Sequence, residues 1–330
     1  MFGREDWQQS HREDIIDPDR EIVDPHHHLW AWNSIPPYLL DELWADTSDG
    51  HNVTKTVYIQ CGWGYRKDGP ENMMPVGETE FVANVAAEAA RKPEKAQIAG
   101  IVSHADLRDP DLDAVLDAHE AAGQGRFRGI RHIGARDDDE ALAIPGGADE
   151  GLFADPAFRK GLNRLAERGL TFEAWQYHHQ LPEVVSLAKA CPDATIILDH
   201  FSTPLGVGGY AGKRDEIFTK WKSDIAELAT CPNVHAKLGG LAMMDNGWGY
   251  HELEKPVSSD KLVEDQGKYY HHAIEHFGPN RCMFESNFPV DRASVSYHVL
   301  WNAFKKIASN YSDAEQDAML RGTATRVYSL

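Results

Sequence analysis

The sequence contains no apolar run that approaches the roughly 18 residues needed to span a bilayer. Its first twenty residues are charged from position 4 onward and lack the apolar core of a signal peptide, so we expect a cytoplasmic protein. Basic residues are scarce: the chain has 33 Lys and Arg residues and 52 Asp and Glu residues, which gives a formal net charge of −19. No Lys/Arg cluster offsets this charge, which disfavours nucleic acid and membranes as partners.

Other sequence motifs are also missing, and their absence argues against particular folds and reaction types. No GxSxG sequence is present, which argues against a hydrolase with a Ser-His-Asp triad. The segment after the first apolar run, "DPHHHLW", is unlike the glycine-rich turn of a dinucleotide-binding sheet. The four cysteines lack CxxC spacing and lie in or after apolar stretches, so we expect reduced, mostly buried thiols. The hydrophobic content of 42% predicts a packed globular core.

Eight short apolar or β-branched runs alternate with helical patterns along the chain. This alternation predicts a (β/α)8 TIM barrel over residues 21–330, preceded by an N-terminal arm of residues 1–20. A doubly wound open sheet is the alternative. Three long loops, 30–53, 61–77 and 241–260, are expected to form a lid over the barrel. The runs are 21–28, 55–63, 96–105, 127–134, 170–178, 194–200, 233–240 and 281–289.

Polar side chains gather where these eight runs end. In a TIM barrel the active site lies at the carboxyl ends of the strands, so these side chains are expected to face one mouth. Together they are the strongest functional signal in the sequence. They are His26, His28, Gln60, Cys61, His104, Arg131, His132, His178, His179, His200, Lys237, Glu285 and Asn287.

The stretch "IVDPHHHLW" places three histidines in a row at the first strand end. Residues i and i+2 of a strand point the same way, so Asp24, His26 and His28 are expected to share a face that His27 does not. Two imidazoles on one strand face can bind a single Zn²⁺ ion. Asp24 is expected to hydrogen-bond one of them and fix its tautomer. A polar loop that is merely rich in histidine is the alternative.

Five motifs make the sequence resemble the amidohydrolase superfamily. They are "IVDPHHHLW", "WQYHHQLPEVV", "IILDHFSTPLG", "NVHAKLGG" and "RCMFESNFPVD", spread from residue 22 to 291. They most resemble the branch of L-fuconolactonase, L-rhamnono-lactonase, 4-sulfomuconolactonase and 2-pyrone-4,6-dicarboxylate lactonase. The resemblance implies a lactonase that opens a ring ester with an activated water. It also implies one divalent metal, with zinc favoured, held by His26, His28, His178 and His200.

One position departs from the family pattern. The superfamily usually has aspartate on the eighth strand, in a sequence like "GSDWP", where this chain has Asn287 in "ESNFP". Asparagine can coordinate a metal or position a water, but it is not a base near neutral pH. Catalysis without a metal is therefore a second possibility. Glu285 is our candidate for the base, with His200 orienting the water; a structural ion pair of Glu285 with Arg131 or Lys237 is the alternative.

Candidate substrate contacts come from strand ends and loops. Arg131 and Lys237 suit a carboxylate or a lactone carbonyl, and His104 can hydrogen-bond a substrate group. The loop residues Trp30, Trp63 and Trp248 are expected to cover a ring-shaped small molecule, or else to pack the loops down.

Three functional alternatives stay open at this point. An amide or ester hydrolase shares the chemistry of water attack, and a decarboxylase of the same superfamily is the nearest rival. A noncatalytic small-ligand-binding barrel is favoured only by the missing aspartate on the eighth strand. The sequence leaves open whether the protein is a monomer or a homo-oligomer.

Overall fold

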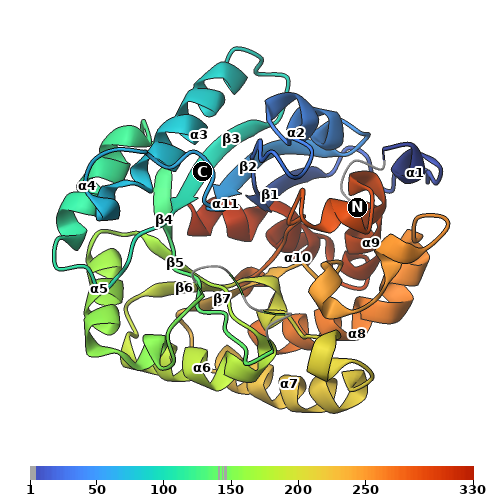
Figure 1. Ribbon diagram of the computed structural model, residues 1–330. Helices are drawn as coiled ribbons and strands as arrows, with labels where there is room; N and C mark the ends of the chain where they lie inside the picture. Colours follow the sequence, from blue (N-terminus) through green and yellow to red (C-terminus); the bar gives the residue numbers. More distant parts are fainter. Residues whose placement is uncertain (1–4, 140–141, 143, 145–146) are drawn as a thin grey trace.

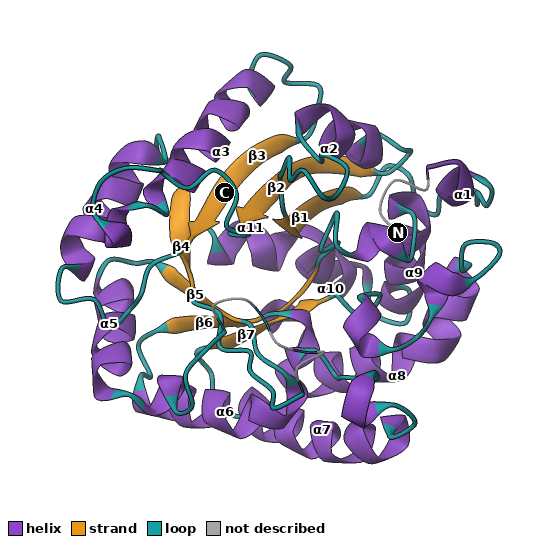
Figure 2. Cartoon of the chain, viewed as in Figure 1, coloured by secondary structure: helices purple, strands orange, loops and turns teal. Residues whose placement is uncertain are grey.

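Eight parallel strands form a barrel in the computed structural model, which describes residues 5–139, 142, 144 and 147–330 (Figures 1 and 2). Each strand pairs with its neighbour in the sequence, in the order β1 to β8. Backbone bonds from Asn287 N to His26 O (3.0 Å) and from His28 N to Phe288 O (2.8 Å) join the last strand to the first. The strands are β1 (Glu21–His27), β2 (Asn52–Ile59), β3 (Gln97–Ser103), β4 (Phe127–Arg131), β5 (Thr171–Ala174), β6 (Thr195–Leu198), β7 (Val234–Leu238) and β8 (Cys282–Phe284).

Helices surround the barrel, as Figure 2 shows. Their starts follow local sequence signals: the Asp155 side chain accepts from Ala157 N ahead of α5, and Ser258 Oγ accepts from Lys261 N at the start of α8. The (β/α)8 barrel predicted from the sequence is thus confirmed. The helices are α1 (Glu5–Gln9), α2 (Leu40–Thr47), α3 (Val76–Ala89), α4 (Leu112–Ala122), α5 (Pro156–Glu167), α6 (Leu181–Ala190), α7 (Arg214–Ala229), α8 (Ser259–Phe277), α9 (Tyr297–Ala308), α10 (Asp313–Asp317) and α11 (Thr323–Val327).

Inside the barrel, apolar side chains of the strands pack against the last helix. Val23, Val57, Val102 and Met283 belong to one buried cluster that Ala324 of α11 and the nearby Tyr328 complete. The four cysteines are free thiols, as predicted. Across the part of the chain that the structure describes, none of the helices combines the length and apolar character that a membrane crossing requires.

The strands end earlier than the apolar runs suggest at two places that matter for the site. β5 ends at Ala174, and residues His178–Gln180 form a 3₁₀ turn (η4) instead of continuing the strand. β8 ends at Phe284, and Asn287 adopts a left-handed conformation with φ of 54°. Side-chain alternation therefore stops before both functional segments.

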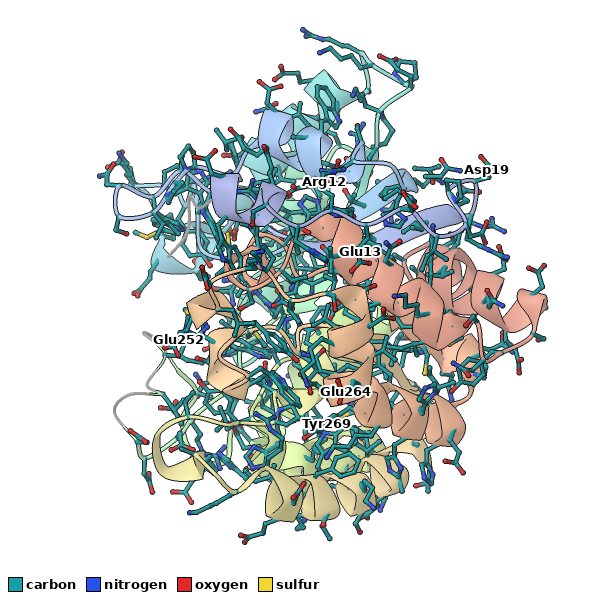
Figure 3. All side chains as sticks on the ribbon, turned by 90° about the vertical axis from the view of Figure 1, so that its right-hand side faces the viewer. Arg12, Glu13, Asp19, Glu252, Glu264 and Tyr269 are labelled. Carbon is teal, nitrogen blue, oxygen red and sulfur yellow. The ribbon has the colours of Figure 1, made fainter. Side chains whose placement is uncertain are left out.

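The N-terminal arm lies across the start of α8 and the middle of α9, on the side of the molecule seen in Figure 3. Glu13 contacts both helices: Ser259 N donates to it at 2.7 Å and Asn302 Nδ2 at 3.2 Å. The Ser259 hydroxyl also donates to Glu13, and Trp7 Nε1 donates to Leu253 O at 3.0 Å. These bonds connect the arm to the helix layer. The division of the chain into an N-terminal arm and a barrel domain stays a prediction.

We expect Glu13→Gln to destabilise the protein only at pH values where Glu13 is ionised. Burial would raise the pKa of Glu13, but the bonds from Ser259 and Asn302 outweigh it and lower the pKa from 4.5 to about 2. The ionised form therefore stabilises the fold above pH 4.5, and this contribution is lost as pH falls toward 2. Because the group is partly exposed, we expect about 1 kcal/mol or less, a fall in Tm of roughly 1–3 °C at pH 7.

Thermal denaturation at pH 7 and at pH 3 measures this effect. The matched control is Asp14→Asn, because Asp14 is exposed and neighbours Glu13. An equal loss of Tm for Glu13→Gln at both pH values would contradict the role of the charge.

Candidate active site

A cavity of about 240 Å³ opens at the carboxyl ends of the strands. Its lining combines imidazoles, one guanidinium, one carboxylate and aromatic rings, so it can hold a small polar ring. The lining residues come from the segments that follow β1, β2, β4, β5, β6, β7 and β8. They are His28, Trp30, Gln60, Cys61, Arg131, Ile133, Trp175, His200, Met243, Asp245, Asn287 and Val290.

Two imidazoles of β1 face each other at the base of this cavity. His26 Nε2 and His28 Nε2 are 3.2 Å apart. His28 Nδ1 donates to Ile59 O at 2.7 Å, and Glu285 Oε2 lies 2.8 Å from His26 Nδ1, so each Nδ1 carries the proton. Burial lowers the pKa of His26 to about 4 and that of His28 well below 6.5, so both rings are neutral at pH 7. The two Nε2 lone pairs therefore point at one another.

Glu285 connects this pair to the histidine that follows β6. Its Oε1 accepts from His200 Nδ1 at 2.7 Å, while its Oε2 faces His26. Burial alone would raise the pKa of Glu285, but His200 and then His26 outweigh it and lower the pKa to about 2. Glu285 is thus an ionised, fully buried carboxylate that orients two imidazoles. His200 itself reaches the cavity.

The backbone at His200 is unusual. Four consecutive residues, 200–203, have φ between 40° and 61°, a region that side chains other than glycine rarely adopt. Ser202 Oγ accepts from Gln176 Nε2 at 2.8 Å, and Thr203 Oγ1 accepts from Trp175 Nε1 at 3.0 Å. The loop after β5 therefore holds this turn in place, as is common for strained segments at functional sites.

A second layer of charges lies below the cavity, inside the barrel. Lys237 Nζ donates to Glu173 Oε2 at 2.8 Å and lies 3.2 Å from Asp199 Oδ1 and 3.1 Å from His26 Nδ1. Burial raises the pKa of Glu173 well above 4.5, which makes it a neutral acid, whereas Lys237 overcomes burial and lowers the pKa of Asp199. The charges of Lys237 and Arg131 thus balance those of Asp199 and Glu285.

Arg131 is fixed at the end of β4. Its Nε donates to Gln60 Oε1 at 3.3 Å, and a terminal nitrogen donates to Gln60 O. The guanidinium also lies 3.6 Å from Asp199 Oδ2 and over the Trp175 ring at 5.7 Å. His132 points the other way and packs against Phe158 of α5. Arg131 therefore presents a preoriented donor group to the cavity.

Asn287 presents its carbonyl oxygen to the same cavity. Its Nδ2 donates to Asp291 Oδ1 at 3.0 Å, which fixes the amide orientation. Its Oδ1 is buried and has no hydrogen-bond partner among the described residues. Asp291 Oδ2 accepts from Ala242 N at 3.1 Å, and burial raises the pKa of Asp291 to about 7. An unpaired buried oxygen of this kind is typical of a ligand-binding position.

Two residues predicted from β1 and β5 lie elsewhere. His178 Nδ1 accepts from Leu205 N at 3.3 Å, and its ring packs on Tyr210, so the structure does not bring His178 to the other histidines. Because β5 ends early, Trp175 lines the cavity instead. No described hydrogen bond joins Asp24 to an imidazole: a register shift follows Asp24 in β1, its Oδ1 accepts from the His26 backbone N at 3.4 Å, and Tyr297 OH of α9 donates to its Oδ2 at 2.9 Å.

Four candidate substrate contacts lie outside the cavity lining, and one of them, Lys237, is the fully buried ammonium described above. His104 Nδ1 donates to Arg131 O at 3.0 Å and supports the end of β4. Trp63 packs edge-on against Trp32, and Trp248 stacks on Tyr250 beneath the Arg214 guanidinium. Their rings pack the loops down, which was the alternative reading of these aromatic residues.

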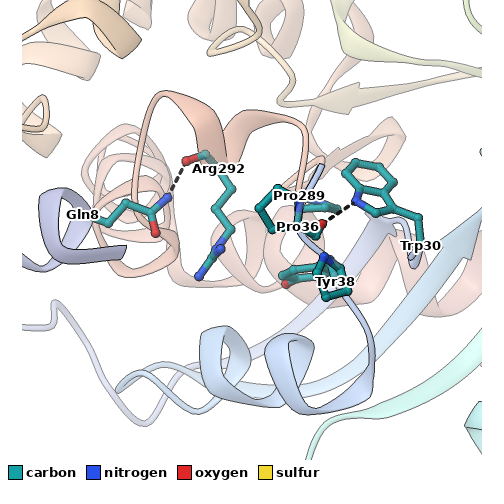
Figure 4. Close-up of a pocket in the computed structure, with 7 residues that line it drawn as sticks. Gln8, Trp30, Pro36, Tyr38, Pro289 and Arg292 are labelled. Atoms are coloured by element: carbon teal, nitrogen blue, oxygen red, sulfur yellow. Dashed lines mark hydrogen bonds between the residues drawn. The ribbon is translucent and has the colours of Figure 1, made fainter. Parts of the chain in front are cut away.

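Trp30 does line the cavity, and two contacts fix the position of its ring. It stacks on His28 at 6.1 Å between ring centroids, and its Nε1 donates to Pro36 O at 3.3 Å. Figure 4 shows the small pocket between Trp30, Pro289 and Arg292, where Gln8 of the arm donates to Arg292 O. The arm thus contacts the segment that follows Asn287.

The sequence alone did not single out Trp175, Met243, Asp245, Glu173 or Asp199 as site residues. Glu173 had a usable signal, since a charged residue inside a buried strand is rare without a partner. Cys61 also reaches the cavity, but burial and the nearby Glu78 raise the pKa of its thiol to about 12. A thiolate nucleophile is therefore excluded near neutral pH.

We expect Gly240→Ala to lower activity about 100-fold or more, because a methyl group there would overlap the His200 ring at Nδ1. Gly240 has φ of 71° and lies just after β7. The matched control is Gly249→Ala, where φ is 70° but the nearest atom to a new Cβ is 3.8 Å away. Both changes cost about 1 kcal/mol of backbone strain. Steady-state kinetics measure the loss of activity, and Tm measures the backbone strain that both variants share. Equal activities of the two variants would contradict a displacement of His200 in Gly240→Ala.

Comparison with known proteins agrees with this geometry. A sequence profile of the family described as Amidohydrolase matches residues 23–330. The protein y4mH of Sinorhizobium fredii is 32% identical over 94% of this chain and 99% of its own. L-fucono-1,5-lactonase of Burkholderia multivorans is 29% identical over 77% of each chain. The crystal structure of an amidohydrolase from Burkholderia multivorans with bound zinc has the same fold, with a TM-score of 0.73, 24% identity and coverage of 94% and 99%.

Proposed function

Because this chain belongs to the amidohydrolase family, we propose that it hydrolyses a lactone to the open hydroxy acid. The observation that carries the proposal is the pair formed by His200 and Glu285. A buried carboxylate fixes the His200 proton on Nδ1, which leaves Nε2 as a proton acceptor at the cavity. The similarity to L-fucono-1,5-lactonase supports a lactone as the substrate class.

The proposed reaction needs an activated water and a polarised carbonyl. His200 Nε2 accepts a proton as the water oxygen bonds to the lactone carbonyl carbon. The ring C–O bond then breaks, and the leaving oxygen takes the proton back from His200. Arg131, held by Gln60, is positioned to stabilise the carbonyl oxygen as its charge develops. Glu285 acts through His200 and not as the base itself, because its pKa of about 2 makes it a weak proton acceptor.

A divalent metal fits the chain at the Nε2 atoms of His26 and His28. Two neutral nitrogens whose lone pairs face each other at 3.2 Å repel unless a cation or proton lies between them, and zinc binds imidazole nitrogens at ~2.0–2.1 Å. Asn287 Oδ1 has no hydrogen-bond partner among the described residues and lines the same cavity, so it would supply a third donor. Such a metal would polarise the lactone carbonyl and lower the pKa of a bound water.

Another group of possible ligands is less suitable. His26, His200 and Glu285 bring one donor atom each within 4.8 Å of one another. However, the Glu285 carboxylate already accepts a hydrogen bond from His200 Nδ1. The Lys237 ammonium also lies 3.1 Å from His26 Nδ1. A second cation there would be repelled by Lys237. We therefore propose His26, His28 and Asn287 as the ligands, with His200 free to move protons.

Hydrolysis of a lactone panel, read with a pH indicator, tests the proposed function. The panel contains five- and six-membered sugar lactones, unsubstituted lactones, the matching cyclic amides and an aromatic carboxylic acid as a decarboxylation substrate. Turnover of lactones is expected; turnover of only the amides, or release of CO₂ alone, would overturn the proposal. Metal analysis of protein purified without chelator accompanies the assay, and active enzyme with less than about 0.1 equivalents of metal would remove the metal role.

A further inference from the structure

Among the described residues that line the cavity, Asp245 is the one carboxylate. It lies in the 3₁₀ turn Met244–Asn246 (η7) of the loop after β7 and is partly buried. No described side chain forms a hydrogen bond or ion pair with its carboxylate, and burial alone raises its pKa. The mechanism proposed above gives this group no role. A half-buried carboxylate without a partner is therefore available to a ligand.

The loop holds Asp245 rigidly. Its carbonyl accepts from Gly206 N at 2.8 Å, and the next residue, Asn246, donates from Nδ2 to Pro204 O at 2.9 Å. Arg214 donates to Asn246 O at 2.8 Å. Gly206 and Gly247 bring the two loops into direct backbone contact, which leaves no room for a Cβ at either position. The carboxylate is thus preorganised by loops that follow β6 and β7.

The positive charges around the cavity do not neutralise the carboxylate of Asp245. Among the described residues, Arg131 is the one cation in the lining, and the Asp199 carboxylate 3.6 Å from it pairs with its charge. A ligand entering the cavity therefore meets a free negative charge, which attracts hydroxyl donors and repels carboxylates.

We propose that Asp245 is the specificity residue of this cavity and accepts hydrogen bonds from hydroxyl groups on the lactone ring. The site then prefers a neutral, hydroxylated lactone over a lactone that bears a carboxylate. This inference rests on the proposed function and names its substrate class.

Two variants separate the hydroxyl contact from the charge. Asp245→Ala removes both, and it should lower the ratio of kcat/KM for a polyhydroxylated six-membered lactone to that for δ-valerolactone about 10- to 100-fold. Asp245→Asn keeps an acceptor oxygen but no charge, and it should raise kcat/KM for a carboxylated six-membered lactone about 10-fold relative to δ-valerolactone. Ratios within one variant cancel any loss of folded protein.

The matched control is Asp193→Asn, an exposed carboxylate before β6 that changes the net charge by the same amount. Its ratios should equal those of the wild type. Unchanged ratios in Asp245→Ala would overturn the inference, even if lactones are hydrolysed. If no lactone is hydrolysed, the proposed function fails, and calorimetric binding then tests Asp245 separately. Wild-type protein should bind a polyhydroxylated lactam at least about 10-fold more tightly than Asp245→Ala does, and equal affinities would reject the role of Asp245.

Discussion

Glu285→Gln is expected to lower kcat about 10³- to 10⁴-fold with little change in KM. The carboxylate of Glu285 faces His200 Nδ1 and His26 Nδ1 with one oxygen each. A glutamine has one oxygen and one NH₂ group, so at least one of the two histidines would face a donor and change its tautomer. Protonation of His200 at Nε2 would remove the proton acceptor from the cavity. Steady-state kinetics with the best lactone of the panel measure this loss.

Two further variants make the result interpretable. Glu183→Gln removes a carboxylate that pairs with Arg136 at 2.7 Å on the surface, and it should retain wild-type kcat. Glu285→Asp keeps the charge and should recover part of the activity lost in Glu285→Gln. Equal Tm values for Glu285→Gln and Glu285→Asp would show that the difference in kcat is chemical. Activity of Glu285→Gln within about threefold of the wild type would contradict the positioning role.

Lys237→Met is expected to destabilise the protein by about 3–5 kcal/mol, a fall in Tm of roughly 5–15 °C. Lys237, Glu173 and Asp199 have no exposed surface. Removing the ammonium leaves the Asp199 carboxylate buried without its nearest cation, which costs far more than an exposed pair. Chemical denaturation and Tm measure the change.

A surface pair and a double variant are the controls. Lys189 pairs with Glu227 at 2.9 Å with both side chains more than half exposed, so Lys189→Met should cost less than about 0.5 kcal/mol. Adding Asp199→Asn to Lys237→Met removes both buried charges and should restore part of the stability. If the two single lysine variants have the same Tm, the buried ion pair does not carry the expected energy.

The barrel itself could be predicted from the sequence because apolar runs and helical patterns alternate eight times. Sequence alternation also located His26 and His28, which reach the site on one face of β1. Asp24 was misplaced because the register of β1 shifts between it and these histidines, a change that depends on pairing with β2. A single strand read alone carries no information about such a shift.

The fifth and eighth strands show a similar limit. His178 was expected at a strand end, but β5 stops four residues earlier and Trp175 takes the position at the cavity. The charges of Glu173 and Lys237 were visible in the sequence, yet their pairing joins residues 64 positions apart. Asp245 lies in a loop whose shape depends on contacts with the loop after β6. Local patterns do not encode these long-range contacts.

The charges inside the barrel bear on how the chain folds. Glu173, Asp199, Lys237 and Glu285 come from four consecutive strands, β5 to β8 or the residues just after them. An intermediate that has collapsed around β1 to β6 holds Asp199 with Arg131 at 3.6 Å but without Lys237, the nearer cation at 3.2 Å. Because burial of an incompletely paired charge is costly, we expect water to remain near Asp199 until β7 and β8 dock. We therefore expect the last water to leave the barrel when the sheet closes.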